Sequence, residues 1–225
     1  MKEILMVWDI DGTLINGKGC GRAAMEKAFY KLFGRERAFE DVRMAGRLDA
    51  MIVKDAFFKH TIIDGDKKLF FDTYCKILEE ILKRKEYIEI LPGVKNILAY
   101  NSKEHKFFHA LGTGNIERGA RLKLEVHDLN QYFLVGGFGD EEVERWEIIQ
   151  RAIQRAQKVH EIKYHKENIY VIGDTKLDIE CAKILGIKSI AVATGGNSVE
   201  ELKTHSPDYL LENLEDKNKF LKIFD

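Results

Sequence analysis

Acidic side chains with the spacing of a catalytic or metal site occur at two places in the sequence. Asp9 and Asp11 follow an apolar run near the amino terminus, and Asp174 and Asp178 follow another apolar run. In an extended chain Asp9 and Asp11 point to one face, with Cα atoms about 6.6 Å apart. At an effective dielectric constant of about 20, charges at that distance repel by roughly 2.5 kcal/mol unless a cation lies between them. Carboxylates without a histidine or cysteine cluster are typical of an Mg²⁺ site.

A further polar group follows a different apolar run. Thr113, Gly114 and Asn115 come just after the run 107–111. Ligands of parallel α/β sheets bind beyond the carboxyl ends of the strands. If each run is a parallel strand, these residues and the acids converge on one edge of the sheet. A buried carboxylate such as Asp9 is costly without a partner, so we interpret this edge as a functional site.

The apolar runs predict strands that alternate with helices. Six runs have the length and residue types of strands: 4–10, 107–111, 132–138, 169–172, 189–193 and 209–211. Helical periodicity occupies 140–159, with Asp140 as its amino-terminal cap, and 177–185, which Gly186 closes. Apolar strands connected by helices predict a doubly wound, Rossmann-like α/β core with a parallel sheet.

The alternation fails between the first two strands. Residues 16–88 show only helical patterns, among them a stripe of apolar residues at fourfold spacing between Leu69 and Leu82. We therefore predict an all-helical cap domain at 16–88, inserted into an α/β core formed by 1–15 and 89–225. A Leu-Pro-Gly turn after this segment marks the return of the chain to the core.

Composition limits the function classes further. The chain has 225 residues, of which 45% are hydrophobic, enough for a buried core without disulfides. With a formal net charge of −1, the chain lacks the excess of positive charge that a general nucleic-acid binder carries. Cys20, Cys75 and Cys181 are far apart and odd in number, which favours a reducing, cytoplasmic location. The first residues contain no apolar run long enough for a signal peptide or a span, so we expect no membrane partner.

Together the motifs resemble those of a known family. The motif Asp-Ile-Asp-Gly-Thr-Leu at 9–14, Thr113, and the motif Gly-Asp-x-x-x-Asp at 173–178 are similar in order and spacing to the haloacid dehalogenase superfamily of phosphatases. The segments 45–49 and 112–122 resemble the phosphoglycolate-phosphatase-like members, which carry a helical cap after the first strand. The resemblance covers nearly the whole chain.

The resemblance implies an enzyme that hydrolyses a small phosphorylated metabolite. Asp9 would be the nucleophile that takes the phosphoryl group, and Asp11 would be the general acid and base. Dehalogenase members of the superfamily lack the second acid, so Asp11 speaks against carbon–halogen cleavage. A short phosphorylated acid, a sugar phosphate and a nucleotide monophosphate are the alternatives for the substrate.

The resemblance also implies a cofactor and the residues that bind it and the phosphoryl group. The implied ligands of Mg²⁺ are Asp9, the carbonyl of Asp11, and Asp174, while Asp178 binds the ion directly or supports the other ligands. The phosphoryl oxygens would be bound by Thr113 and by the backbone amides of Gly114 and Asn115. An Mg²⁺ ion with oxygen ligands agrees with the chemistry inferred from the carboxylates themselves.

Two positions depart from the family pattern. The family commonly has a lysine at the start of the helix before the strand 169–172, and this chain has Arg145 there. Because arginine can bind phosphate through two hydrogen bonds, we expect Arg145 to bind the phosphoryl group. In the cap, Leu48 stands where related proteins have threonine, which removes a hydroxyl that could contact substrate. Arg47 and Asp49 beside it are the remaining candidates for substrate contact.

Other function classes fit parts of the sequence. The segment from Gly12 to Lys18 resembles the phosphate loop of nucleotide-triphosphate enzymes, but Gly19 stands where that loop needs a serine or threonine. A phosphomutase on the same fold is a second alternative, although we identify no dedicated acid or base in the cap. A catalytically silent phosphate-binding module is a third, which the intact acids disfavour.

Overall fold

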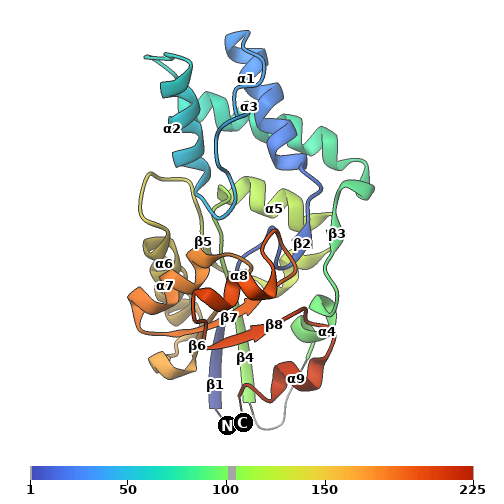
Figure 1. Ribbon diagram of the computed structural model, residues 1–225, viewed down its shortest axis with the longest axis vertical. Coiled ribbons are helices and arrows are strands. Elements are labelled where there is room, and N and C mark those ends of the chain that lie inside the picture. Colours follow the sequence, from blue (N-terminus) through green and yellow to red (C-terminus); the bar gives the residue numbers. More distant parts are fainter. Residues whose placement is uncertain (1, 101–104, 225) are drawn as a thin grey trace.

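A parallel six-stranded sheet forms the centre of the computed structural model, which describes residues 2–100 and 105–224 (Figure 1). From one edge to the other the strands are β5 (Gly136–Gly137), β4 (His105–Gly112), β1 (Lys2–Trp8), β6 (Ile169–Gly173), β7 (Lys188–Val192) and β8 (Tyr209–Leu211). This order places β1 inside the sheet, with β4 and β6 as its neighbours.

Helices cover both faces of this sheet. They are α4 (Val94–Leu98), α5 (Glu117–Glu125), α6 (Arg145–His160), α7 (Lys176–Leu185), α8 (Val199–Thr204) and α9 (Lys217–Leu221). Ile4, Met6 and Trp8 of β1 share a buried cluster with side chains of α4, α5 and α9. Leu5 and Val7 point to the other face and share a cluster with α6 and α7. The doubly wound α/β core predicted from the sequence is confirmed.

Two predicted elements differ from the structure. The strand predicted at 132–138 pairs only at β5, because the chain before it forms a 3-10 helix. The helix predicted at 140–159 begins only after Glu144, which forms a reciprocal cap with the residue three positions later. Asp140 was wrongly predicted as its cap. Its carboxylate instead accepts the backbone N–H of Glu117 at the start of α5.

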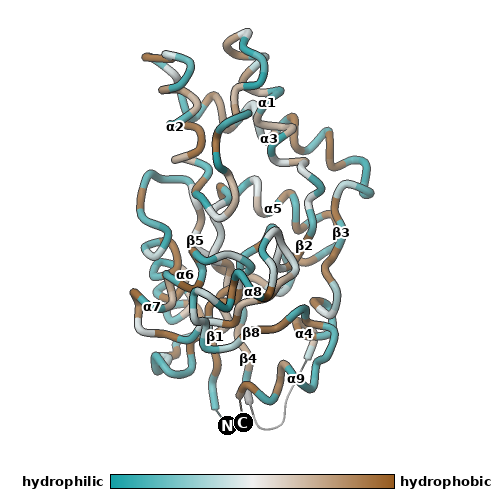
Figure 2. The backbone as a smooth tube through the Cα atoms, viewed as in Figure 1, coloured by the Kyte–Doolittle hydropathy of each residue, from teal (hydrophilic) through white to brown (hydrophobic). Residues whose placement is uncertain are grey.

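The inserted helical cap is present between the first two core strands. It contains α1 (Cys20–Phe33), α2 (Asp49–Lys59) and α3 (Lys67–Leu82), and the short strands β2 (Ile15–Asn16) and β3 (Glu89–Ile90) pair where the chain leaves and re-enters the core. Figure 1 shows these helices at the end of the molecule opposite to the termini. Apolar and polar residues alternate along them in Figure 2, as expected for helices with one buried face. We propose 16–88 as the extent of the cap.

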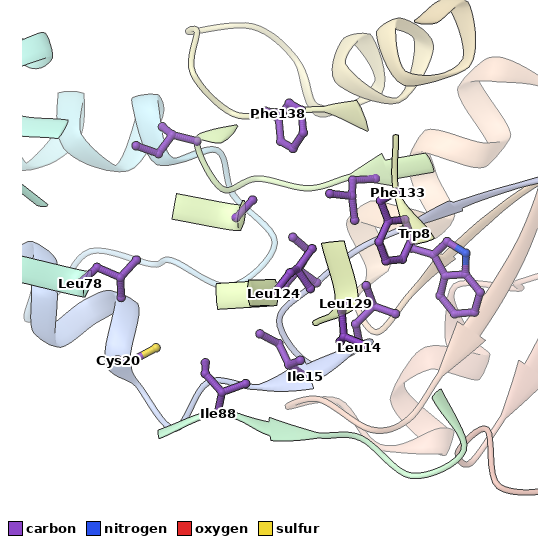
Figure 3. Packing of buried hydrophobic residues seen from close by; sticks show 14 of the residues in the cluster. Trp8, Leu14, Ile15, Cys20, Leu78, Ile88, Leu124, Leu129, Phe133 and Phe138 are labelled. Carbon is purple, nitrogen blue, oxygen red and sulfur yellow. The ribbon is translucent and has the colours of Figure 1, made fainter. Parts of the chain in front are cut away.

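A continuous hydrophobic cluster joins the cap to the core. It includes Cys20 and Leu78 from the cap helices, Ile15 and Ile88 at the two connections, and Leu124 of α5 (Figure 3). Such contacts between buried side chains pack the cap directly on the core.

Two further features bear on the composition of the chain. Its three cysteines are buried, and none forms a disulfide. Over residues 2–100 and 105–224, no helix combines the length and the apolar character that crossing a bilayer requires. The fold is therefore held together by the apolar clusters on the two faces of the sheet.

Candidate active site

Three neighbouring strands end at one edge of the sheet and place polar residues there. Trp8, the last residue of β1, pairs with residues near the carboxyl ends of β4 and β6. Asp9, Thr113 and Asp174 follow these strands and therefore line one cavity. The cavity has a volume of about 460 Å³ and is lined by both core and cap residues.

Asp9, Asp174 and Asp178 form a compact carboxylate cluster in this cavity. One oxygen of each lies within 4.8 Å of the others, and all three side chains are buried. Arg145 Nη2 lies 3.1 Å from Asp9 Oδ2 and 2.6 Å from Asp178 Oδ1. When ionised, the carboxylates therefore outnumber the guanidinium by two negative charges. A divalent cation with oxygen ligands balances that excess, so the donor set fits Mg²⁺.

Burial and the neighbouring negative charges make two of these carboxyl groups, those of Asp174 and Asp9, hold protons more tightly. Burial, together with the charges of Asp9 and Asp178, raises the pKa of Asp174 to about 8. Burial also raises the pKa of Asp9 to about 6, although the nearby Arg145 guanidinium opposes the shift. A cation among the oxygens favours their ionised forms. Protons and a cation therefore compete for this cluster.

Arg145 lies where the resemblance predicts a phosphate-binding lysine. It is the first residue of α6, and the cap at Glu144 starts that helix beside the sheet edge. Its Nη1 donates a hydrogen bond of 2.8 Å to the carbonyl of Gly46 in the cap. Burial opposes its charge, but the carboxylates of Asp178 and Asp9 outweigh that effect and raise the pKa of Arg145. The side chain is thus a fixed cation that contacts both core and cap.

Asp178 holds this arginine and the start of a helix at the same time. Its Oδ2 accepts hydrogen bonds from the backbone N–H and the hydroxyl of Thr175, at 3.1 Å and 2.7 Å. Its Oδ1 accepts two from Arg145. Both oxygens are engaged by protein groups, which fits support of the metal ligands better than direct binding of a cation.

Asp11 is oriented differently from the prediction for an extended chain. Because β1 ends at Trp8 and the chain then turns, Asp11 does not share one strand face with Asp9. Its Oδ2 accepts hydrogen bonds from Lys123 Nζ at 2.6 Å and from Asn115 Nδ2 at 2.8 Å. The prediction that the two side chains point to one strand face is therefore wrong, and the cation expected between their carboxylates stays a prediction. The carbonyl of Asp11, which the resemblance implies, is unaffected by this correction.

Lys123 is a site residue that the sequence analysis missed. It lies on α5, is only 4% exposed, and its Nζ also donates a hydrogen bond of 2.7 Å to Asn115 Oδ1. Burial disfavours its charge, but the neighbouring acidic groups, Asp11 foremost, together outweigh that effect and raise the pKa of Lys123. A signal was present in the sequence. Ile116 and Ala120 lie seven and three positions earlier, on the helix face that packs into the core, where lysine is unusual.

Thr113, Gly114 and Asn115 form the loop predicted to bind phosphoryl oxygens. Thr113 is fully buried, and its Oγ1 accepts the backbone N–H of Asn115 at 3.3 Å and its side-chain amide at 2.9 Å. The backbone amide of Asn115 is thus engaged within the loop. Gly114 is required by a close approach, because a Cβ there would lie 2.1 Å from the carbonyl oxygen of Arg47. The cap therefore rests directly on this loop.

The cap residues Arg47 and Asp49 have different surroundings. The guanidinium of Arg47 turns to Asp55 on α2, at 2.6 Å. Asp49 is buried, its Oδ2 accepts the backbone N–H of Ile116 at 2.9 Å, and its own N–H donates to the carbonyl of Gly114 at 2.7 Å. Burial raises the pKa of Asp49 to about 7. Asp49 thus attaches the start of α2 to the loop that follows β4.

The segment from Gly12 to Lys18 does not form the phosphate loop of the alternative function. The backbone N–H groups of Leu14 and Ile15 donate to the carbonyl of Ile10, at 2.9 Å and 3.1 Å, and that of Gly12 donates to Ile15. Lys18 Nζ donates to a backbone carbonyl in the segment by which the chain leaves the cap. A phosphate loop needs its amides unoccupied. This alternative is therefore wrong.

The raised carboxyl pKa values predict how the stability of EDTA-treated protein depends on pH. A carboxyl group whose folded-state pKa is raised keeps a proton that the unfolded chain has already released, so the free energy of unfolding falls as the pH rises towards that pKa. Burial lowers the pKa of His109 to about 4 from 6.5, which acts in the opposite direction below pH 6.5. Between pH 6.5 and 8 the effect of Asp49 and Asp174 remains.

Urea unfolding in EDTA at several pH values across this window measures the effect. We expect the free energy of unfolding to decrease with rising pH, and Asp174→Asn to remove most of that decrease. The exposed Asp64 offers a matched control, because Asp64→Asn should keep the wild-type slope. A wild-type stability that rises or stays constant from pH 6.5 to pH 8 would contradict the account of the cluster.

The chain is similar to known proteins along almost its whole length. The family of haloacid dehalogenase-like hydrolases matches residues 6–192. A proposed pyrophosphatase, PpaX, of Caldanaerobacter subterraneus subsp. tengcongensis is 26% identical over 223 residues, which cover 99% of this chain and 96% of that protein. Phosphoglycolate phosphatase of Pseudomonas fluorescens is 24% identical over 226 residues, 93% of this chain and 76% of that protein. The crystal structure of a CbbY variant from Rhodobacter sphaeroides with xylulose-1,5-bisphosphate has a similar fold, with a TM-score of 0.72, 18% identity, and coverage of 94% of this chain and 95% of that one.

Proposed function

The chain belongs to the haloacid dehalogenase-like hydrolase family, and from this membership we propose that it is a magnesium-dependent phosphatase that acts through an aspartyl phosphate on Asp9. The observation that carries the proposal is the cluster of Asp9, Asp174 and Asp178 with Arg145 at the edge of the sheet. It combines a buried nucleophile, a fixed cation and oxygen ligands for a metal. The relatives named as phosphatases support the reaction class.

In the first step of the proposed reaction Asp9 is the nucleophile. One of its carboxylate oxygens forms a bond to phosphorus while the bond between phosphorus and the ester oxygen breaks. Arg145, 3.1 Å from Asp9 Oδ2, balances negative charge on the transferring group. Thr113 and the backbone amide of Gly114 line the same cavity and donate to the phosphoryl oxygens.

Asp11 moves the protons of both steps. It gives a proton to the departing ester oxygen and then takes one from the water molecule that attacks the aspartyl phosphate. The second step forms inorganic phosphate and restores the carboxylate of Asp9. The cap covers the cavity, which keeps bulk water from the reacting groups while the ester is bound.

Asp9, Asp174 and the carbonyl of Asp11 would hold the magnesium ion, with Asp178 in support. When bound, Mg²⁺ stabilises negative charge on the phosphoryl oxygens as a Lewis acid. The oxygen donors and the excess of negative charge support Mg²⁺ over Zn²⁺, which prefers nitrogen and sulfur ligands. Because Asp174 has a pKa of about 8 without a cation, metal binding displaces a proton and should tighten as the pH rises.

The proposed substrate is a small phosphorylated metabolite. A cavity of about 460 Å³ is within the range of small-molecule sites. Relatives that carry the names pyrophosphatase and phosphoglycolate phosphatase also support a small phosphorylated compound. Leu48 packs into the hydrophobic cluster beneath α6, so the position where related proteins have threonine contributes no polar group to the site.

A phosphate-release screen tests the proposed function. The purified protein is incubated with phosphorylated short acids, sugar phosphates and nucleotide monophosphates, in MgCl₂ or in EDTA. We expect phosphate release from at least one class in MgCl₂ and none in EDTA. Equal hydrolysis in EDTA would contradict the metal requirement, and no release from any class in MgCl₂ would contradict the phosphatase assignment.

Loss of one proposed metal ligand should weaken activation by Mg²⁺. Asp174→Ala is expected to raise the Mg²⁺ concentration for half-maximal activity by about 10- to 100-fold, because few protein oxygens hold the ion. Titration of the activity with MgCl₂ measures this change. The matched control is Glu200→Ala, which removes an exposed acid on α8 and should leave the titration unchanged. Activation of Asp174→Ala at wild-type concentrations would show that Asp174 is not a ligand.

A further inference from the structure

Hydrogen bonds join the side chains of Asp11, Lys123 and Asn115 in a closed ring. Lys123 Nζ donates to Asp11 Oδ2 at 2.6 Å and to Asn115 Oδ1 at 2.7 Å, and Asn115 Nδ2 donates to the same Asp11 oxygen at 2.8 Å. The amide of Asn115 also donates to Thr113 Oγ1 at 2.9 Å. Asp11 is therefore tied to the loop after β4, which faces the cavity.

Lys123 is fixed in this ring by its burial. Its side chain is 5% exposed, so its ammonium needs protein partners and loses stabilisation if it turns away from them. The first turn of α1 covers it, because a Cβ on Gly21 would lie 3.4 Å from Lys123 Nζ. An exposed ion pair would exchange among many rotamers. The ammonium of Lys123 is instead enclosed between a core helix and a cap helix.

Asp11 has more freedom than its partner. Its side chain is 44% exposed, and its Oδ1 faces the connection to the cap, where a Cβ on Gly17 would lie 3.2 Å away. Without Lys123, the carboxylate of Asp11 would keep Asn115 as its partner in the ring. It would then have room to rotate into the cavity, away from the position that the ring imposes.

We propose that Lys123 is a positioning residue that, together with Asn115, holds the carboxylate of Asp11 where proton transfer occurs. The inference rests on the proposed role of Asp11 as general acid and base. Lys123 acts through Asp11, while Arg145 is the cation paired with the nucleophile Asp9. A role at Asp11 also accounts for a lysine on the apolar face of α5.

A double-mutant cycle between Lys123 and Asp11 tests this proposal. Lys123→Met keeps the length of the side chain and removes its charge. With an aryl phosphate, whose leaving group needs little protonation, formation of the phosphoenzyme should change by less than about threefold, whereas its breakdown should slow by about 10- to 100-fold. Since kcat/KM reports formation of the phosphoenzyme, kcat and KM should fall together while kcat/KM stays close to the wild-type value. In the Asp11→Asn background the same substitution should slow breakdown no further, within about twofold.

Several outcomes separate this role from others. Lys123→Arg should recover part of the breakdown rate, and Lys95→Met, at an exposed lysine on α4, should behave as wild type. If Lys123→Met does not fold, as judged by thermal unfolding, Lys123→Gln replaces it in the cycle. The proposal is wrong if Lys123→Met slows both steps equally, or if it slows breakdown as much in the Asp11→Asn background. Wild-type breakdown in Asp11→Asn alone would instead overturn the proposed role of Asp11.

Discussion

Asp9→Asn should form no phosphoenzyme with any substrate and should lose roughly 10⁴- to 10⁶-fold in kcat, as expected when a covalent nucleophile is removed. The carboxamide is nearly isosteric with the carboxylate but is a far poorer nucleophile. The fold should be retained, because Arg145 keeps its contacts with Asp178. Steady-state phosphate release and intact-mass analysis after rapid quenching measure the two effects.

A matched substitution separates loss of the nucleophile from loss of the fold. Asp64→Asn makes the same chemical change at an exposed aspartate of the cap and should keep wild-type activity. Thermal unfolding of Asp9→Asn should show no loss of stability, since the substitution removes a carboxyl group whose charge burial disfavours. If Asp9→Asn still acquires a phosphoryl group, the nucleophile lies elsewhere.

Asp11→Asn should accumulate the phosphoenzyme that Asp9→Asn cannot form. An aryl leaving group needs little help from an acid, so phosphorylation of Asp9 should proceed with such a substrate. Hydrolysis of the intermediate needs a base, and its loss should slow turnover by roughly 10²- to 10⁴-fold. Rapid mixing should show a burst of phenol near one equivalent of enzyme, followed by slow release.

The choice of leaving group provides the control for this prediction. With an alkyl phosphate, Asp11→Asn should show no burst, because the departing oxygen then needs a proton from Asp11. Asp64→Asn, which makes the same substitution outside the cavity, should hydrolyse both esters at wild-type rates. An Asp11→Asn variant that turns over both esters at wild-type rates would exclude Asp11 as the acid and base.

The sheet edge could be predicted from sequence because its chemistry lies at strand ends. Asp9, Thr113 and Asp174 each follow an apolar run, and parallel strands direct their carboxyl ends to one edge. The place of Arg145 could be predicted for a related reason, since it stands at the start of a helix that leads into β6. Local pattern and sheet geometry together are sufficient for such positions.

The orientation of Asp11 could not be predicted in this way. Spacing alone places it on one face with Asp9, but its partner Lys123 is 112 residues away in the sequence. The turn after β1 and the packing of α5 jointly decide where its carboxylate points. The start of α6 depends on a similar distant contact, because Asp140 is used by Glu117 of α5 and Glu144 becomes the cap.

The burial of Asp49 depends on how the cap meets the core. An aspartate in the first turn of a helix is usually exposed and interacts with the helix dipole. Here the start of α2 lies against the loop after β4, and the carboxylate of Asp49 accepts the N–H of Ile116. Such burial follows from the docking of two separately patterned units, which no local pattern in either unit specifies.

Locating the phosphoryl group on the chain is the most direct test of a covalent route through Asp9. Asp11→Asn is mixed with an aryl phosphate and MgCl₂, quenched during the burst, and reduced with borohydride, which converts an aspartyl phosphate to homoserine. Sequencing of the tryptic peptide that spans 3–18 then identifies the modified position. We expect homoserine at Asp9 and none in Asp9→Asn treated identically. Homoserine at another acid, or none in the Asp11→Asn sample, would contradict a covalent route through Asp9.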